Sequence, residues 1–394
     1  MKLVDTIKEK AKLYHSDIVN WRRTIHANPE LAFEEYQTAE FIASKLNEWD
    51  IPFTSGVAKT GIVALISGKP GGSTIALRGD MDALPILEEN EVPYKSTQAG
   101  KMHACGHDVH TAALLGATKI LNDIKTEFTG NIKLIFQPSE EKWPGGASLM
   151  IAEGVLENPK PQSIFGQHVY PMLPAGKVGF RPGMYMASAD EIYITVKGKG
   201  GHAALPQNNI DPIVIAAHLI TSLQQVVSRH ANPFTPSVLS FGKIAGGATT
   251  NVIPDTVELA GTFRTMDEDW RKKAHTIIKD MATQLCQSMG GTCDIDIKVG
   301  YPFLKNDEAL TARAKAAAIT YLGAENVVDL GTRMTAEDFA YYTQHMPACF
   351  YRLGTASPNG SNSSPVHTPT FDIDETALET ASGLMAYLAV GEMG

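Results

Sequence analysis

One short segment of the sequence, MHACGHDVH, concentrates three histidines, a cysteine and an aspartate ahead of an apolar stretch. Cys105 and His107 are two residues apart, a spacing that lets one loop direct a thiolate and an imidazole at the same ion. A lone cysteine is more often a small buried apolar residue, but the Cys-Gly-His context favours a metal ligand. Structural roles are open to the other members: helix capping for Asp108, and packing for His103 and His110.

Two adjacent carboxylates, Glu140 and Glu141, close the apolar run NIKLIFQPSEE. One of them can bind metal while the other moves a proton, provided that it lies within about 2.6 to 3.2 Å of that proton or one water away. An exposed acidic turn would explain this pair alone equally well. His168, in GQHVYP, and His367, in PVHTPTF, are also weak candidates when each is taken singly.

The strength of the hypothesis lies in the whole set of candidate ligands. One thiolate, three imidazoles and one carboxylate exceed what a single zinc ion takes from a protein, which favours two metal ions. The proposed ligands are Cys105, His107, Glu141, His168 and His367. Asp82 is placed to accept a hydrogen bond from a ligand histidine and so to orient it, and Asp80 is a second candidate for this role. A Cys/His/Glu set suits Zn, Mn, Co or Ni.

Strands and helices must position these residues. From about residue 62 to 165, short apolar runs alternate with helical patterns, which is typical of an α/β domain with a buried, largely parallel sheet. Three apolar runs each lead into polar residues. These are Arg78, Asp80 and Asp82 after the first run, Glu140 and Glu141 after the second, and His168 after the third. Because open α/β sheets gather ligands at the carboxyl ends of their strands, we expect these side chains to converge at one edge.

The pattern changes between residues 183 and 299, where a strand, a helix, two strands, a helix and a strand follow one another. This βαββαβ order is typical of a ferredoxin-like α+β module. We therefore expect a metal-binding catalytic domain from residues 1–182 plus 300–394, interrupted by an inserted domain at 183–299. The C-terminal part predicts helices over 309–323 and 335–346.

Three residues of the inserted segment are candidates for substrate contacts. His202 lies on the glycine-rich turn VKGKGGHAALP, which fits the presentation of a single imidazole. Asn251 and Arg264 lie at or near strand ends, and the planar fork of arginine suits a substrate carboxylate. As isolated residues, both would more often be structural.

Bulk composition narrows the class of protein. A chain of 394 residues with 43% hydrophobic and 20% charged residues is expected to form an ordinary globular protein of two domains. Its net charge of -9 argues against a nucleic-acid surface. Acidic residues interrupt the N-terminal segment where a signal peptide needs an apolar run. No stretch is long and apolar enough to span a membrane. The four scattered cysteines fit a reducing compartment. We therefore expect a cytoplasmic protein.

Several sequence blocks resemble those of a known family, the aminoacylase and carboxypeptidase family of dinuclear metallohydrolases. Within it, the chain looks like the subgroup of hippurate hydrolases, N-acetyl-amino-acid deacetylases and auxin-conjugate hydrolases. The resemblance covers nearly the whole chain. The matching blocks, in order, are WRRTIHANPELAFEE, LRGDMDALP, MHACGHDVHTAALLG, IFQPSEE followed by GGA, GQHVYP, GKGGHAALP, TNVIPD, GTFR, MTAEDFAYY and SPVHTPTFD.

The resemblance implies a catalytic domain split by a smaller lid or dimerisation domain, with the five ligands named above and Glu140 as general base. His202 would stabilise the oxyanion, in many relatives from the partner subunit of a homodimer, and Asn251 and Arg264 would hold the substrate. Where the wider family has His-x-Asp, this chain has Asp80-Met81-Asp82. Cys105 and His107 substitute for the missing histidine, as they do in the subgroup.

The expected activity is hydrolysis of N-acyl amino acids, such as N-acetyl or N-benzoyl derivatives, by a hydroxide held between two divalent metal ions. A dipeptidase or aminopeptidase on the same scaffold is the alternative within hydrolases. A metal-free amidase with Cys105 as nucleophile would leave Glu141, His168 and His367 without a role. A non-catalytic binding protein is the third alternative, which the complete ligand set opposes.

Overall fold

The computed structural model describes residues 3–357 and 364–393, which form two compact units. Unit 1 takes its described residues from Met1–Gly183, Lys305–Gly331 and Asp338–Gly394. Unit 2 consists of Met184–Leu304 and Thr332–Glu337. Each unit has its own hydrophobic core.

Unit 1 is built on an eight-stranded sheet in the order β1-β2-β4-β3-β5-β16-β6-β15. The four central strands run parallel, as their continuous apolar runs predict. They are β4 (Thr129–Gln137), β3 (Lys69–Asp80), β5 (Ser163–Pro174) and β16 (Ala348–Ala356). Antiparallel pairings flank them. The outer strands are β1 (Phe53–Val57), β2 (Gly61–Ser67), β6 (Val178–Phe180) and β15 (Val327–Asp329).

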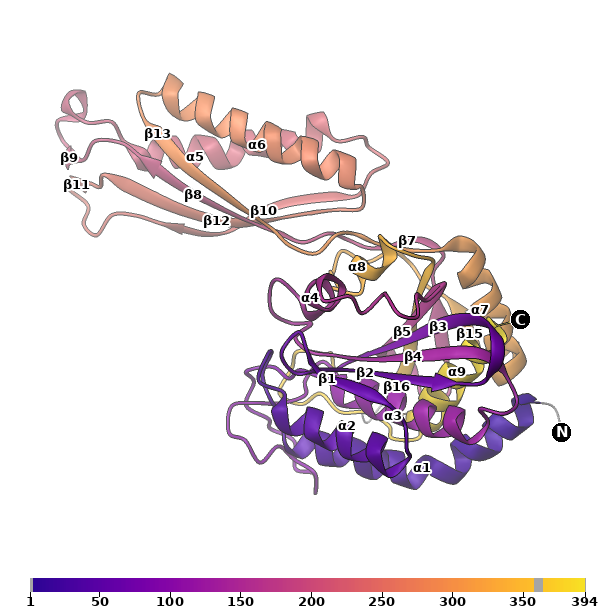
Figure 1. Cartoon of the computed structure of the whole chain (residues 1–394). Helices are drawn as coiled ribbons and strands as arrows, with labels where there is room; N and C mark the ends of the chain where they lie inside the picture. The colour runs from indigo at the N-terminus through magenta and orange to yellow at the C-terminus, as the bar shows by residue number, and fades with distance from the viewer. Residues whose placement is uncertain (1–2, 358–363, 394) are drawn as a thin grey trace. The chain divides into compact units, whose positions relative to one another are not determined.

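Three long helices, α1 (Leu3–Ala27), α3 (His107–Asp123) and α9 (Ala377–Gly391), pack against one another on one face of this sheet (Figure 1). Their close approach depends on Gly116 in α3, where a Cβ atom would lie only 2.6 Å from Ile18 of α1. The remaining elements of unit 1 are α2 (Tyr36–Glu48), α4 (Gly146–Ala152), α7 (Glu308–Leu322), α8 (Ala340–Thr343) and a 3-10 turn (Ala324–Asn326).

One predicted helix is wrong. The pattern over 335–346 predicts a helix, but only the four residues Ala340–Thr343 are α-helical. The physical reason is a non-local pairing upstream: the carbonyl of Thr335 accepts the backbone N–H of Ala187, and the N–H of Arg333 donates to the carbonyl of Tyr185. This pairing holds the backbone at the start of the predicted span in an extended bridge to residues 185–187, so the helix cannot begin there.

Unit 2 is a four-stranded antiparallel sheet in the order β10-β12-β8-β13, with two helices on one face (Figure 1). The strands are β8 (Asp190–Lys197), β10 (Ser237–Ala245), β12 (Thr256–Thr265) and β13 (Thr292–Val299). The helices are α5 (Pro212–Leu223), which continues into a π-helical turn (Val226–His230), and α6 (Glu268–Ser288). This βαββαβ order confirms the predicted ferredoxin-like module.

Short elements complete the two units. A two-stranded ribbon joins β9 (Gly201–His202) to β11 (Val252–Ile253) within unit 2. The others are β7 (Gly183–Met186), β14 (Leu304–Asn306) and a 3-10 turn (Pro206–Asn208). None of the described helices combines the length and apolar character needed to cross a membrane.

Candidate metal centre

The carboxyl ends of the parallel strands bring the predicted site residues of unit 1 together. Asp80 is the last residue of β3, Glu140 and Glu141 follow β4 after a two-residue turn, and His168 lies within β5. Cys105 and His107 come from the loop that leads into α3. This is the convergence that the positions of the apolar runs predict.

The five proposed ligands form one connected cluster. The Cys105 Sγ atom lies 3.4 Å from His168 Nε2 and 3.3 Å from His367 Nε2. His367 Nε2 in turn lies 3.0 Å from Glu141 Oε1. Candidate ligand atoms lie within 4.8 Å of one another in three overlapping groups: Cys105, His107 and His168; Cys105, Glu141 and His367; and His107, Glu140 and Glu141.

Two buried atoms of this cluster have no hydrogen-bond partner among the described residues, which fits a role in binding a cation. They are Nε2 of His107 and Oε1 of Glu141; the latter is near His367 but without hydrogen-bond geometry. Buried polar atoms without partners are rare and costly unless a ligand or ion satisfies them. The donor set and the overlapping groups of nearby ligand atoms therefore fit divalent metal ions.

The pKa shifts within the cluster point the same way. Burial, followed by the nearby carboxylate of Glu141, raises the pKa of the Cys105 thiol to about 11. The close approach of Cys105, followed by that of Glu141, raises the pKa of His367 to about 10. The protein alone thus does not lower the pKa of Cys105 as a nucleophilic cysteine requires, whereas an adjacent cation stabilises a thiolate.

Asp82 organises the cluster from behind. Its Oδ1 accepts hydrogen bonds from Nδ1 of His107 (3.0 Å) and from the backbone N–H of Glu140 (3.0 Å). Its Oδ2 accepts the N–H of Glu141 (2.9 Å). One buried carboxylate thereby sets the ring orientation of His107, leaving Nε2 toward the cluster, and fixes the backbone of both glutamates.

His168 is oriented by a second chain of contacts. Its Nδ1 donates to the carbonyl of Val169 (2.9 Å), so Nε2 faces Cys105. The N–H of Val169 donates to Nε2 of His110 (2.9 Å), and Nδ1 of His110 must therefore donate to Asp80 (2.5 Å). His110 is thus a bonded link and not only a packing residue, as the sequence left open.

Asp80 also joins the buried Arg78, whose Nη1 donates to Asp80 Oδ2 (2.6 Å) and whose Nη2 donates to Asp338 (2.7 Å). Burial opposes the charge on Asp80, but Arg78 and the neighbouring histidines hold the pKa of Asp80 well below its usual range. Asp338 also accepts from Gln137 and from the N–H of Ala147. Asp338 is not among the site residues predicted from the sequence. The block that contains it, MTAEDFAYY, indicates the family but no role for this residue.

One prediction in the cysteine segment is wrong: Asp108 does not cap α3. The N-cap residue is Gly106, which has no side chain to cap the helix. Asp108 is buried, and its Oδ2 accepts from Arg22 Nε (2.6 Å) and lies 2.8 Å from Nδ1 of His26. His103 is also buried, and burial lowers its pKa to about 4, so it packs as a neutral ring.

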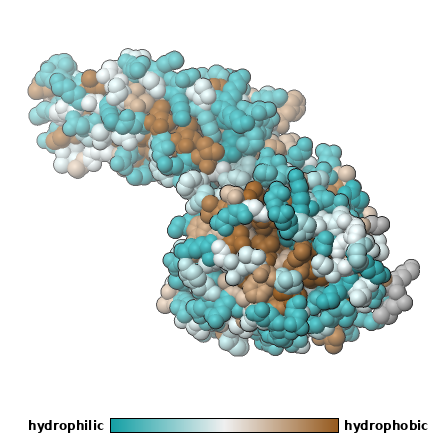
Figure 2. All heavy atoms as spheres, in the orientation of Figure 1, coloured by the Kyte–Doolittle hydropathy of each residue, from teal (hydrophilic) through white to brown (hydrophobic). Residues whose placement is uncertain are grey.

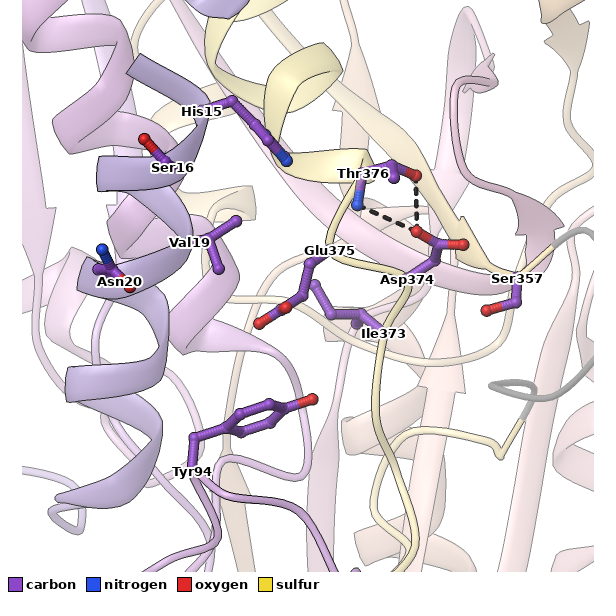
Figure 3. A pocket seen from close by; sticks show the side chains of 10 residues that line it. All are labelled: His15, Ser16, Val19, Asn20, Tyr94, Ser357, Ile373, Asp374, Glu375 and Thr376. Carbon is purple, nitrogen blue, oxygen red and sulfur yellow. Dashed lines mark hydrogen bonds between the residues drawn. The ribbon is translucent and has the colours of Figure 1, made fainter. Parts of the chain in front are cut away.

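A hollow on unit 1 lies at the edge of this Arg22 network, between α1 and the segment before α9 (Figure 3). His15 and Val19 face it from α1, and Glu375 and Asp374 face it from the opposite side. The acidic groups are engaged: Glu375 pairs with Arg23, and Asp374 accepts from Thr376. None of the proposed metal ligands lines this hollow.

The candidate residues of unit 2 fall into two places. His202 lies in β9 opposite Val252 of β11, and the carbonyl of Asn251 accepts the N–H of Ala203, so His202 and Asn251 share one ribbon. Nδ1 of His202 accepts the N–H of Ala204 (3.1 Å), which leaves Nε2–H as an outward donor in the neutral ring. Arg264 lies on β12, and its buried Nη1 has no hydrogen-bond partner within the described part of the chain.

Comparison with known proteins defines the class. Residues 76–390 match the sequence profile of peptidase family M20/M25/M40, and the chain belongs to this family. It is 40% identical over 374 residues to the putative amidohydrolase YhaA of Bacillus subtilis, covering 95% of this chain and 94% of the relative. It is also 40% identical over 382 residues to the N-acetyl-L-cysteine deacetylase of the same organism, covering 96% and 89%.

Among solved structures, the chain is similar to the YXEP protein of Bacillus subtilis, described as a dinuclear metal-binding peptidase of the M20 family. The TM-score is 0.83 with 34% sequence identity, over 97% of this chain and 99% of that chain. These findings confirm the family resemblance, the α/β fold with an inserted α+β module, and the use of divalent metal.

Proposed function

We propose that this protein is a metal-dependent amidohydrolase that cleaves the amide bond of N-acyl amino acids, such as N-acetyl or N-benzoyl derivatives. The observation that carries the proposal is the connected cluster of one thiolate, three imidazoles and one carboxylate, with the second carboxylate of Glu140 beside it. The similarity to an N-acetyl-L-cysteine deacetylase and to an amidohydrolase supports a substrate of this class.

The cluster is proposed to hold two divalent ions, because five ligands exceed the needs of one. Zn, Mn, Co and Ni all suit these donors. When bound, such ions polarise the substrate carbonyl and lower the pKa of water toward neutrality. The residues proposed to hold them are Cys105, His107, Glu141, His168 and His367.

Glu140 is proposed as the general base. It is only 7% exposed, and one of its oxygens lies within 4.8 Å of ligand atoms of His107 and Glu141. At this position its carboxylate can take a proton from the attacking water and return it to the departing nitrogen. Its backbone N–H is held by Asp82, which restricts where the side chain can point.

His202, Asn251 and Arg264 are proposed to contact the substrate. The outward Nε2–H of His202 is the kind of donor that an oxyanion requires. The unpartnered Nη1 of Arg264 suits a carboxylate, which the amino-acid part of the substrate carries.

The test uses Glu140→Gln together with a substrate panel. We expect the variant to keep its metal content and to lose turnover, because glutamine keeps the shape of glutamate but cannot accept the proton. The panel contains N-acetyl-methionine, hippurate and dipeptides, assayed with and without added metal. Near-normal turnover in Glu140→Gln would refute the assignment of the base, and hydrolysis of the dipeptides alone would refute the substrate class.

A homodimer formed through unit 2 in the cytoplasm is also proposed. Figure 2 shows hydrophobic residues gathered on the visible surface of unit 2. The side chain of Ile244, on the edge strand β10, is 56% exposed, and that of Phe234, which precedes this strand, is 90% exposed. All four cysteines are free, which fits a reducing compartment. Light scattering on wild type and Ile244→Asp tests the dimer: a monomeric wild type would contradict it.

A further inference from the structure

Glu35 is a fully buried glutamate whose carboxylate accepts three hydrogen bonds. Its Oε1 accepts the backbone N–H groups of Phe33 (2.9 Å) and Ser139 (2.9 Å). Its Oε2 accepts the hydroxyl of Thr60 (2.6 Å). The bond to Ser139 ties the start of α2 to the turn after β4, and Ser139 directly precedes Glu140.

This turn has an unusual backbone. Ser139 has a φ of 51°, in the left-handed region that costs a residue with a Cβ atom on the order of 1 kcal/mol or more. The next two N–H groups, of Glu140 and Glu141, both donate to Asp82. Two buried carboxylates, Glu35 and Asp82, therefore fix three consecutive amides.

We propose that Glu35 is a positioning residue for Glu140, which holds the N–H of Ser139 so that the Glu140 side chain starts from a fixed backbone. This inference rests on the proposed function, in which Glu140 moves the proton. A general base must lie within about 2.6 to 3.2 Å of that proton, and a displacement of about 1 Å can cost about 100-fold in rate. Asp82 holds the backbone at and after Glu140, whereas Glu35 holds the strained residue before it.

The contacts indicate that Glu35 acts through the position of its acceptor oxygens, which depends on side-chain length, and not through its charge. All three partners are donors, and burial raises the pKa of Glu35 to about 7. A glutamine at this position keeps an oxygen that can accept both backbone N–H groups, and the hydroxyl of Thr60 can turn to accept from the amide. An aspartate keeps the charge but ends about 1.5 Å short, the length of one carbon–carbon bond.

Glu30 provides a matched control on the same segment. It is also buried, and its carboxylate accepts the N–H groups of Gln37 (3.0 Å) and Thr38 (2.9 Å) as well as the hydroxyl of Thr38. It therefore makes the same kind and number of hydrogen bonds, but all to the first turn of α2. Shortening Glu30 should affect stability without acting on the turn at Ser139.

The experiment compares Glu35→Gln, Glu35→Asp and Glu30→Asp with wild type. It measures kcat and KM on N-acyl amino acids, metal content, and hydrogen–deuterium exchange of peptides covering residues 139–146. We expect Glu35→Gln to stay within about 3-fold of the wild-type kcat. Glu35→Asp should lose about 10- to 100-fold in kcat, with KM and metal content nearly unchanged and faster exchange in 139–146. Glu30→Asp should leave both kcat and this exchange unchanged.

Wild-type kcat in Glu35→Asp would overturn the proposal, and so would an equal loss in Glu35→Gln or in Glu30→Asp. If Glu35→Asp does not fold, Glu35→Met, of similar length but without acceptors, carries the same expectation. A wild-type protein inactive on the whole panel would reject the proposed function instead. The exchange comparison would still decide whether Glu35 holds the turn, because it does not depend on activity.

Discussion

Replacing Asp82 by asparagine should weaken metal binding by more than its general cost to the stability of unit 1 can explain. The carboxylate of Asp82 receives three donors at two oxygens: His107 Nδ1 and the Glu140 N–H at Oδ1, and the Glu141 N–H at Oδ2. Asparagine offers one oxygen, and its NH₂ group faces a donor in either rotamer. At least one of the three hydrogen bonds is therefore lost.

The structure sets the size of the effect. If the amide oxygen takes the place of Oδ1, only the N–H of Glu141 loses its partner; in the other rotamer, His107 and Glu140 both do. A buried N–H left unpaired costs about 1 to 3 kcal/mol. Loss of the group that orients a ligand histidine typically costs about 10- to 100-fold in metal affinity, which is about 1.4 to 2.8 kcal/mol. We expect metal affinity to fall within that range.

Competition with a chromophoric chelator at fixed pH measures the affinity, and chemical unfolding of metal-free protein measures the stability. Asp190→Asn is the matched control. Asp190 is an equally buried carboxylate of unit 2, which accepts from Arg271 and lies 2.7 Å from His275 Nε2. That variant should lose stability and keep its metal affinity. Unchanged affinity in Asp82→Asn, or an equal loss in Asp190→Asn, would refute the reasoning.

Three further predictions concern the buried residues Arg22 and Glu35 and the exposed His202. Arg22→Met removes the guanidinium from the buried carboxylate of Asp108, which keeps only its contact with His26, so the free energy of unfolding should fall by about 3 to 5 kcal/mol. Lys10→Met removes a partner from a pair nearer the surface and should change it by under about 1 kcal/mol. Equal urea midpoints in the two variants would contradict this. Burial raises the pKa of Glu35 from 4.5 to about 7, so the folded state binds the proton of this carboxyl more tightly than the unfolded state does. The stabilisation of the fold by this proton is complete below pH 4.5 and is lost as the pH rises through 7. Glu35→Gln should therefore gain stability relative to wild type across that window, by up to about 3 kcal/mol, and a pH-independent difference in unfolding free energy would argue against it. His202→Ala should lower kcat by about 10²- to 10³-fold with metal content intact, and an unchanged kcat would remove His202 from the mechanism.

The fold could be predicted where hydrophobic periodicity reports local structure. The continuous apolar runs at β3, β4 and β5 indicated buried parallel strands, and the βαββαβ order of unit 2 was readable from alternating patterns. The helix predicted over 335–346 does not form at its start, because the backbone at Arg333 and Thr335 pairs with residues 185–187. A contact across about 150 positions leaves no mark in local periodicity.

The same distinction applies to the site. The ligand types and their density around Cys105 and His107 predicted a metal cluster, because few other uses explain such a combination. The contact between Glu35 and Ser139 spans 104 positions, and that between Arg22 and Asp108 spans 86. No spacing rule covers such distances, so the sequence around Asp108 indicates only a local role such as a helix cap.

Asp80 shows why residue type at a strand end does not by itself define a ligand. Both of its oxygens are already engaged, Oδ2 by Arg78 and Oδ1 by His110. Through His110 it holds the N–H of Val169, whose carbonyl orients His168. A carboxylate bound to a buried guanidinium in this way stays charged and fixed, which suits the support of a ligand better than direct coordination. Asp80 thus serves the cluster indirectly, and the thiolate of Cys105 is proposed as the metal donor in its place.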